Sequence, residues 1–299
     1  MINFDTKGVL DAHIHCGPEI IPRKYDSISL SQTLHESGMS AVIKNHFTET
    51  ASWACMSAKY AHDNLIGAVV LNHYVGGISE DAIRGALGFT HQGKPTLRMV
   101  WMPTMHAAGH IQMRKDAGSD YDIPEEWTGG KPVAGRQLLS SITPISFNNT
   151  PLIKWDKVLE IIAANDLVLA TGHLTGADVK KLVPLAHQHG VKRILITHPL
   201  YGATDLKANE LRDLVSAYNV YVEQTYALYL LDHIAIERKI EQIQAVGIDN
   251  TILSSDLGQL SSPPPADGLK DFAAKLVQAG LTLAQIDQMT KINPQKLIL

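Results

Sequence analysis

The stretch GVLDAHIHCG, residues 8–17, ends an apolar run on two histidines, His13 and His15. Residues two apart in a strand point to the same side, so the sequence predicts that Asp11, His13 and His15 share one face. Two imidazoles on one face at the end of a strand can bind a single metal ion. The remaining ligands of such an ion have to come from other parts of the chain.

Seven further short runs, rich in β-branched and apolar residues, follow this stretch. They read SAVIKNH (40–46), IGAVVLNH (66–73), LRMVWMPT (97–104), LVLATGH (167–173), RILITHP (193–199), VYVEQTY (220–226) and TILSSDLG (251–258). Helical patterns lie between them, for example over 28–38, 176–190 and 208–219, and several end on Gly or Asn, as helices commonly do. Eight alternating strand and helix units predict a single-domain (β/α)₈ barrel over residues 1–299. A doubly wound open sheet is the alternative, but the glycine-rich phosphate loop typical of its first strand is not in the sequence.

One connection is much longer than the others. From about 105 to 156, after the fourth predicted strand, the sequence is polar, dotted with Gly and Pro, and without clear periodicity. Loops of this length inside a compact domain commonly cover a binding site, so we expect a lid-like insertion over the substrate. At the other end of the chain, residues 282–298 predict two short helices broken at Pro294.

Composition limits the classes of protein to consider. The chain is 45% apolar and 19% charged with a formal net charge of −4, which gives no basic stripe for nucleic acid. Two cysteines are too few for a disulfide framework, and neither a signal peptide nor a membrane-spanning run is evident. We therefore expect a cytoplasmic enzyme of a small-molecule substrate, with no nucleic-acid or membrane partner. The sequence leaves the oligomeric state open, and a homo-oligomer is compatible with it.

Polar side chains stand at the ends of most of the predicted strands. They are His13, His15, Lys44, His46, His73, His173, His198 and Asp256. The active sites of (β/α)₈ barrels gather at the carboxyl ends of the strands, so these residues converge in space. Imidazoles and a carboxylate suit zinc, and also manganese, iron or cobalt, with one or two ions per chain. A lysine ammonium beside such cations would be repelled, so we expect Lys44 either to have a lowered pKa or to be carbamylated, and then to bridge two metals.

This set of motifs resembles the amidohydrolase superfamily. The resemblance rests on HIH in the first strand, TGH in the fifth, THP in the sixth and SSD in the eighth, which together run from residue 13 to 256. It implies that His13, His15 and Asp256 hold one metal ion and that His173 and His198 hold another. It also implies that Asp256 takes a proton from the attacking water and passes it to the leaving group.

Two features depart from the superfamily pattern. The bridging lysine of many members comes from the fourth strand, which here offers neither Lys nor Glu, so that either Lys44 supplies the bridge or the site holds one metal. The first strand also begins almost at the N-terminus, which resembles the compact, barrel-only members of the superfamily.

For several residues near these strand ends the sequence allows more than one role. Arg23 is a candidate clamp for a substrate carboxylate or a member of a surface ion pair. His46 is a candidate substrate contact, metal ligand or hydrogen-bond donor to another ligand. Glu223 is a candidate partner of Lys44 or of the substrate, and Asp256 could instead cap a helix. Cys16 directly follows His15 in the strand, so it is expected to point away from the site. His73 and His106 are expected in loops.

The function predicted from these observations is hydrolysis of an amide, cyclic amide, ester or lactone bond in a small molecule. Water activated by the metal attacks the carbonyl, and Asp256 carries the proton. A single-metal, non-oxidative decarboxylase is the first alternative, because such enzymes do without the bridging lysine. A phosphoesterase and a non-catalytic binding protein are weaker alternatives. The sequence does not define the substrate.

Overall fold

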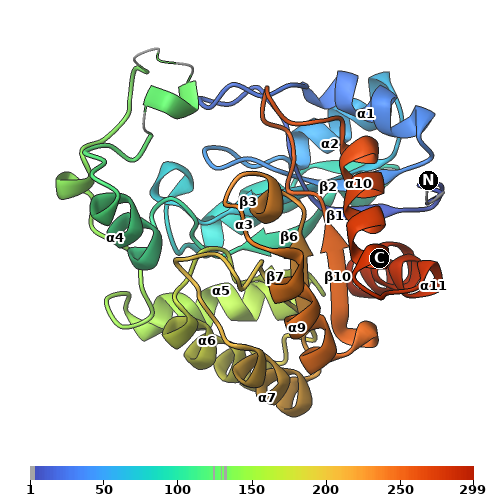
Figure 1. Cartoon of the computed structure of the whole chain (residues 1–299). Coiled ribbons are helices and arrows are strands. Elements are labelled where there is room, and N and C mark those ends of the chain that lie inside the picture. Colours follow the sequence, from blue (N-terminus) through green and yellow to red (C-terminus); the bar gives the residue numbers. More distant parts are fainter. Residues whose placement is uncertain (1–3, 124, 129, 131–132) are drawn as a thin grey trace.

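Eight parallel strands form the barrel in the computed structural model, which describes residues 4–123, 125–128, 130 and 133–299 (Figure 1). The strands are β1 (Leu10–His15), β2 (Ser40–Lys44), β3 (Leu65–Val70), β6 (Leu97–Trp101), β7 (Val168–Ala170), β8 (Arg193–Ile196), β9 (Tyr221–Thr225) and β10 (Thr251–Ser254), paired in that order. The last strand meets the first where the His15 amide donates to the Leu257 carbonyl and the Asp256 amide to the His13 carbonyl, each over 2.7 Å. The predicted (β/α)₈ barrel and its eight strands are confirmed.

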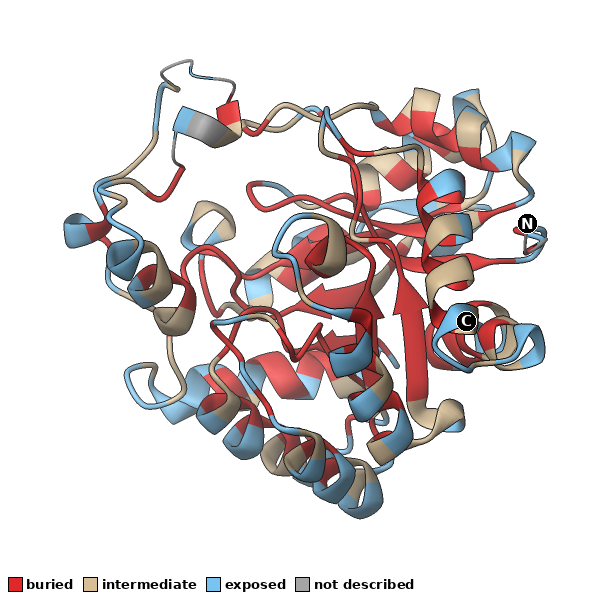
Figure 2. Ribbon diagram, viewed as in Figure 1, coloured by how far each residue is buried: buried red, intermediate tan, exposed pale blue. Residues whose placement is uncertain are grey.

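Helices surround the barrel and bury one side against it, as Figure 2 shows. They are α1 (Ser27–Glu36), α2 (Ala51–Tyr60), α3 (Glu80–Leu87), α4 (Ala108–Asp116), α5 (Leu152–Ala164), α6 (Gly176–Gln188), α7 (Ala208–Tyr218), α8 (Ala227–Leu230), α9 (Ile236–Val246), α10 (Pro265–Gln278), α11 (Leu283–Asp287) and α12 (Asn293–Ile298). A short hairpin, β4 (Thr90–His91) and β5 (Lys94–Pro95), lies outside the barrel. Among the described residues, no helix combines the length and the apolar character needed to cross a membrane.

The amino ends of the strands are closed by the C-terminal helix. Leu297 and Ile298 of α12 pack inside the barrel against a cluster that includes Leu10 and Ile252. The predicted break at Pro294 is wrong, because α11 continues through a π-helix, η5 (Gln288–Ile292), into α12. Pro294 is the second residue of α12, directly after the π-helical turn, and the helix continues past it although it has no amide hydrogen to donate.

The insertion after β6 is more ordered than its sequence indicates. It contains α4 and two short 3₁₀ helices, η2 (Glu125–Thr128) and η3 (Leu139–Ser141). Ile123 packs with Met105, Phe47 and Ile21 in a small apolar cluster. The helical pattern of α4 is weak because it buries little, with His110 and Ile111 as its buried residues.

A bulge in β1 decides which of its side chains reach the site. Leu10 and Ala12 face the barrel interior, whereas Ile14 and Cys16 pack outside it. The pairing with β2 shifts by one residue between Asp11 and Ile14, which turns His13 and His15 inward. The prediction that Asp11 shares their face is therefore wrong. Its Oδ1 accepts hydrogen bonds from the amides of His13 (3.1 Å) and Ser255 (3.0 Å), the latter being the first residue after β10.

Candidate metal and active site

His13 is fully buried at the base of the site, and its neighbours fix its tautomer. Lys44 Nζ lies 3.0 Å from His13 Nε2, and Glu223 Oε1 lies 3.2 Å from His13 Nδ1. A lysine amine carrying its proton can only donate, so Nε2 accepts and Nδ1 carries the hydrogen that goes to Glu223. Burial first, and the cations Lys44 and Arg23 second, lower the pKa of His13 well below its usual value. With Lys44 protonated, His13 presents an Nε2 without hydrogen to the centre of the site. Asp256 Oδ1 lies 3.0 Å from this nitrogen, so the two acceptors need a cation between them.

Glu223 supports the site from below. Its side chain is fully buried on β9, where it also accepts from Ser254 Oγ (2.6 Å) and from the amide of His198 (3.2 Å). Glu223 is not among the residues that line the cavity. It lies where it can orient His13, and not where the predicted contact with the substrate would form. A carboxylate that orients a histidine ligand from behind is typical of metal sites.

His15 has the opposite tautomer. Arg23 Nη2 lies 3.2 Å from His15 Nδ1, and a guanidinium has no acceptor. His15 Nδ1 must therefore accept, so Nε2 carries the hydrogen and donates to Asp256 Oδ1 over 3.2 Å. In this arrangement His15 donates to Asp256, and its predicted role as a metal ligand stays a prediction. Arg23 also pairs through Nε with Glu19, whose side chain is fully buried, so two of its three nitrogens are engaged.

Asp256 follows β10 in the left-handed backbone region, with φ of 53°, which is uncommon for a residue other than glycine. Its Oδ1 lies 3.0 Å from His13 Nε2 and 3.2 Å from His15 Nε2. No hydrogen bond joins Oδ2 to a described residue, and the side chain keeps 15% of its surface exposed. Burial raises the pKa of Asp256, and the nearby Lys44 opposes that rise. The carboxylate therefore has one anchored oxygen and one that is open to the cavity.

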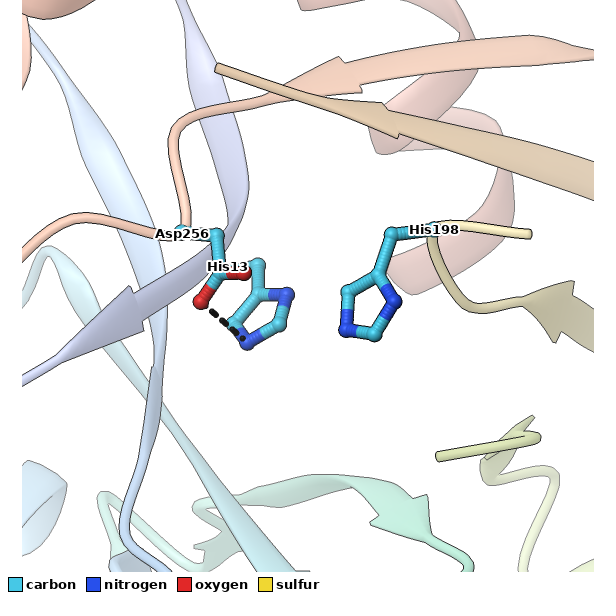
Figure 3. Close-up of side chains that lie close together, drawn as sticks. All are labelled: His13, His198 and Asp256. Carbon is cyan, nitrogen blue, oxygen red and sulfur yellow. Dashed lines mark ion pairs between the residues drawn. The ribbon is translucent and has the colours of Figure 1, made fainter. Parts of the chain in front are cut away.

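Three residues from different strands form a set that fits a metal ion. Ligand atoms of His13, His198 and Asp256 all lie within 4.8 Å of one another, and Figure 3 shows His198 facing the other two across a gap. A tetrahedral zinc with ligands at about 2.1 Å separates neighbouring ligand atoms by about 3.4 Å. Burial lowers the pKa of His198 to about 3, which keeps the imidazole neutral, and its Nδ1 is buried without a hydrogen bond. Two neutral imidazoles beside a carboxylate are a donor set suited to a divalent cation.

Lys44 competes with such a cation for His13. Its Nζ lies over the Trp101 ring at 4.2 Å, and the side chain is 1% exposed. Burial lowers the pKa of Lys44, while Asp256 and Glu223 oppose the shift. A metal on His13 Nε2 therefore requires that the Lys44 amine leaves or that it is converted to a carbamate, which would itself be a ligand.

His173 stands beside the three-residue set, and its partner was missed in the sequence. The rings of His173 and His198 are 5.1 Å apart, and His173 Nδ1 lies 3.3 Å from Nδ1 of His110 on α4. Tyr201 Oη lies 2.9 Å from the same His110 nitrogen. His110 was not recognised in the sequence, because it lies on α4, inside the stretch that shows no clear helical periodicity.

These groups lie at the bottom of a cavity of about 600 Å³. Its polar floor includes His15, Lys44, His46, His173, His198 and Asp256. Its walls include apolar side chains of the insertion and of the loops after β9 and β10, among them Met105, Trp127, Leu228 and Leu260. The insertion thus contributes walls of the cavity, in line with the predicted substrate-covering role, which stays a prediction.

Cys16, His73 and His106 lie outside the cavity. Cys16 is buried in the outer apolar cluster, as its parity indicates. His106 is buried and its Nδ1 accepts from the amide of His73 over 3.0 Å, so it stabilises the loop after β3. Neither His73 nor His106 lines the cavity.

Solved structures with the same fold carry different activities. The chain is 11% identical to an amidohydrolase from Burkholderia multivorans with bound zinc (TM-score 0.57; 97% of this chain and 98% of that one covered). It is 15% identical to a putative 2-pyrone-4,6-dicarboxylic acid hydrolase from Pseudomonas putida (TM-score 0.57; 99% and 98%) and 9% identical to a 2,6-dihydroxybenzoate decarboxylase (TM-score 0.50; 97% and 99%). At this level of identity the likeness shows the fold alone, a (β/α)₈ barrel.

Comparison of the sequence itself gives one family. No curated protein matches the chain. The model of the family of unknown function DUF6282 matches residues 8–223, which include six of the eight barrel strands in full, the start of β9 and all the candidate ligands except Asp256. The chain therefore belongs to the family of unknown function DUF6282.

Proposed function

We propose that the protein is a metal-dependent hydrolase of an amide, cyclic amide, ester or lactone bond in a small molecule. The observation that carries the proposal is that ligand atoms of His13, His198 and Asp256 lie within 4.8 Å of one another, beside a cavity of about 600 Å³ that His198 and Asp256 line. That volume suits a small organic substrate, and the apolar walls would hold its body while the polar floor meets its reactive group.

A divalent metal, for which zinc is the first candidate, would be held by His13, His198 and Asp256. When bound, it would polarise a carbonyl oxygen and make a nearby water more acidic. Glu223 keeps His13 in the tautomer that leaves Nε2 free. The number of ions and the carbamylation of Lys44 stay predictions, because the second predicted ion also needs His173 and a bridging anion.

The proton transfers belong to Asp256. His15 anchors Oδ1, so Oδ2 is free to accept a proton from water as its oxygen bonds to the carbonyl carbon. A carboxylate whose pKa is raised by burial is a better base than one in water, and it returns the same proton to the leaving nitrogen or oxygen. Arg23 holds His15 in place; its predicted contact with a substrate carboxylate stays a prediction.

Hydrolysis of three probe compounds tests the proposal: dihydrocoumarin as a lactone, hydantoin as a cyclic amide and 4-nitrophenyl acetate as an ester. We expect zinc-loaded protein to turn over at least one class, and Asp256→Asn to lower kcat by about 10²–10⁴-fold while the fold is retained. Turnover that is equal in wild type and Asp256→Asn would refute the role of Asp256.

One observation favours the decarboxylase as a second candidate. Because His15 donates to Asp256 and β6 supplies no bridging anion, no anion from β6 links the set of His13, His198 and Asp256 to a second ion. Release of carbon dioxide from 2,6-dihydroxybenzoate, with no hydrolysis of the three probe compounds, would support this candidate over the hydrolase.

A further inference from the structure

His46 stands on the cavity floor with one ring nitrogen held by the protein. It follows β2 directly, and its Nδ1 lies 2.9 Å from Thr104 Oγ1. Its Nε2 makes no hydrogen bond to a described residue and is not among the fully buried unpaired atoms, so it faces the cavity. The His46 ring lies 4.8 Å from that of His15 and 6.3 Å from that of His173. His46 is thus next to His15 and His173 and outside the set of His13, His198 and Asp256.

The orientation of Asn72 is fixed by backbone groups. Its Oδ1 accepts from the amides of Thr104 (2.9 Å) and His106 (3.2 Å), which can only donate. Its Nδ2 must then be the donor, and it donates to the His46 carbonyl (3.0 Å) and to Thr104 Oγ1 (2.8 Å). All the hydrogen-bonding positions of this buried amide are filled, so neither a flip nor a rotation is available to it.

This orientation decides the tautomer of His46. Thr104 Oγ1 accepts from Asn72, so its own hydrogen is left for His46 Nδ1, the remaining partner within hydrogen-bond distance among the described residues. The reverse, with Nδ1–H donating, would leave the hydroxyl hydrogen of the fully buried Thr104 without an acceptor. His46 Nδ1 is therefore the acceptor, and the single ring hydrogen of the neutral imidazole is on Nε2.

We propose that His46 is a catalytic hydrogen-bond donor, whose Nε2–H the Asn72–Thr104 pair aims at the substrate's carbonyl oxygen. The proposal rests on the proposed hydrolase function and deepens it. As the water oxygen bonds to the carbonyl carbon, the C=O π electrons move onto the oxygen, and the His46 N–H stabilises that charge without giving up its proton. Because Nδ1 accepts from the Thr104 hydroxyl, the ring carries a single hydrogen, and the donor is the neutral imidazole.

The alternative is that His46 ligates a second cation with His15 and Glu19, whose ligand atoms lie within 4.8 Å of one another. Glu19 is already occupied, because Oε1 accepts from the His46 amide (3.0 Å) and Oε2 pairs with Arg23. The guanidinium of Arg23 also lies against His15 Nδ1, where it would repel a cation. Charge and hydrogen bonding both favour the donor role.

Long-range ¹⁵N–¹H correlation spectra of the full chain, labelled on histidine, test the tautomer without any turnover. His46 is assigned by the signals that vanish in His46→Gln. We expect a bare Nδ1 and a protonated Nε2 with or without zinc. Thr104→Val should move His46 toward the other tautomer, and Thr104→Ser should preserve it. A protonated Nδ1 in the wild type, or a zinc-induced shift that shows coordination of Nε2, would overturn the proposal.

Kinetics on the hydrolysed probe compound test the catalytic role. We expect His46→Ala to lower kcat by about 10²–10³-fold, with a smaller change in KM, and His46→Gln, whose amide can still donate, to lose less. Thr104→Val should lose roughly tenfold, and Thr104→Ser little. A kcat for His46→Ala within twofold of wild type would refute the donor role while the hydrolase function stands. If no probe compound is hydrolysed, the proposed function fails and the spectra still decide the tautomer.

Discussion

Replacing Glu223 by Gln changes one buried oxygen to an amide and tests how the site is held. Glu223 accepts hydrogen bonds from His13 Nδ1, Ser254 Oγ and the amide of His198. Gln keeps one acceptor oxygen, which can serve two of these donors, and turns an NH₂ group toward the third. A buried donor without an acceptor costs about 1–3 kcal/mol, so we expect the free energy of unfolding to fall by about that amount.

The same change should weaken metal binding. Without the carboxylate, nothing holds His13 in the Nδ1–H tautomer with the same strength, so Nε2 becomes a poorer ligand. Loss of such an orienting group lowers metal affinity by about 10–100-fold, which corresponds to about 1.4–2.7 kcal/mol. Zinc affinity is measured by competition with a chromophoric chelator, and stability by urea unfolding of the metal-free protein.

A second buried variant separates these two effects. Asn293 is fully buried at the opposite end of the barrel, where its Nδ2 donates to the carbonyls of Ile248 and Thr251, each over 2.7 Å. Asn293→Ala should lower stability but leave zinc affinity unchanged. Zinc affinity of Glu223→Gln within twofold of wild type, or an equal loss in Asn293→Ala, would refute the reasoning.

The other predictions concern Lys44 and Asp11. If Lys44 is carbamylated, native mass spectrometry in bicarbonate should show the added mass of one carbon dioxide, absent in Lys44→Met; an unmodified wild-type mass excludes the carbamate bridge. Burial raises the pKa of Asp11 to about 7 from 3.8. The folded state therefore favours the protonated form of Asp11. This preference adds about 4 kcal/mol to the free energy of unfolding below pH 3.8, and the addition is lost as the pH rises to about 7. Asp11→Asn should lack this loss in urea unfolding between about pH 4 and 7; an equal pH dependence in both proteins would contradict it.

The barrel and most of its floor could be predicted from the sequence, because strand periodicity and strand-end position are local properties. The order of the strands brings His13, His198 and Asp256 together, whereas the resemblance places His198 with His173 on a second ion. The bulge in β1 could not be predicted, because it depends on the Asp11 carboxylate meeting the end of β10.

The different hydrogen-bonding roles of His13 and His15 could not be predicted from the sequence either. The HIH pattern treats His13 and His15 alike, but Lys44 donates to one and Arg23 to the other. Which nitrogen is bare follows from partners that are distant in sequence, such as Lys44, or held in an irregular loop, such as Arg23. Tautomers, and with them the distinction between ligand and donor, need the folded structure.

Zinc titration of stripped protein tests the central claim most directly. The protein is depleted of metal with a chelator, and hydrolysis of the active probe compound is followed as zinc is added. We predict no turnover without metal and a rise to full turnover at one equivalent, absent in His198→Ala. Full turnover in the stripped protein, or zinc-dependent turnover that survives in His198→Ala, would contradict a metal-dependent hydrolase built on His13, His198 and Asp256.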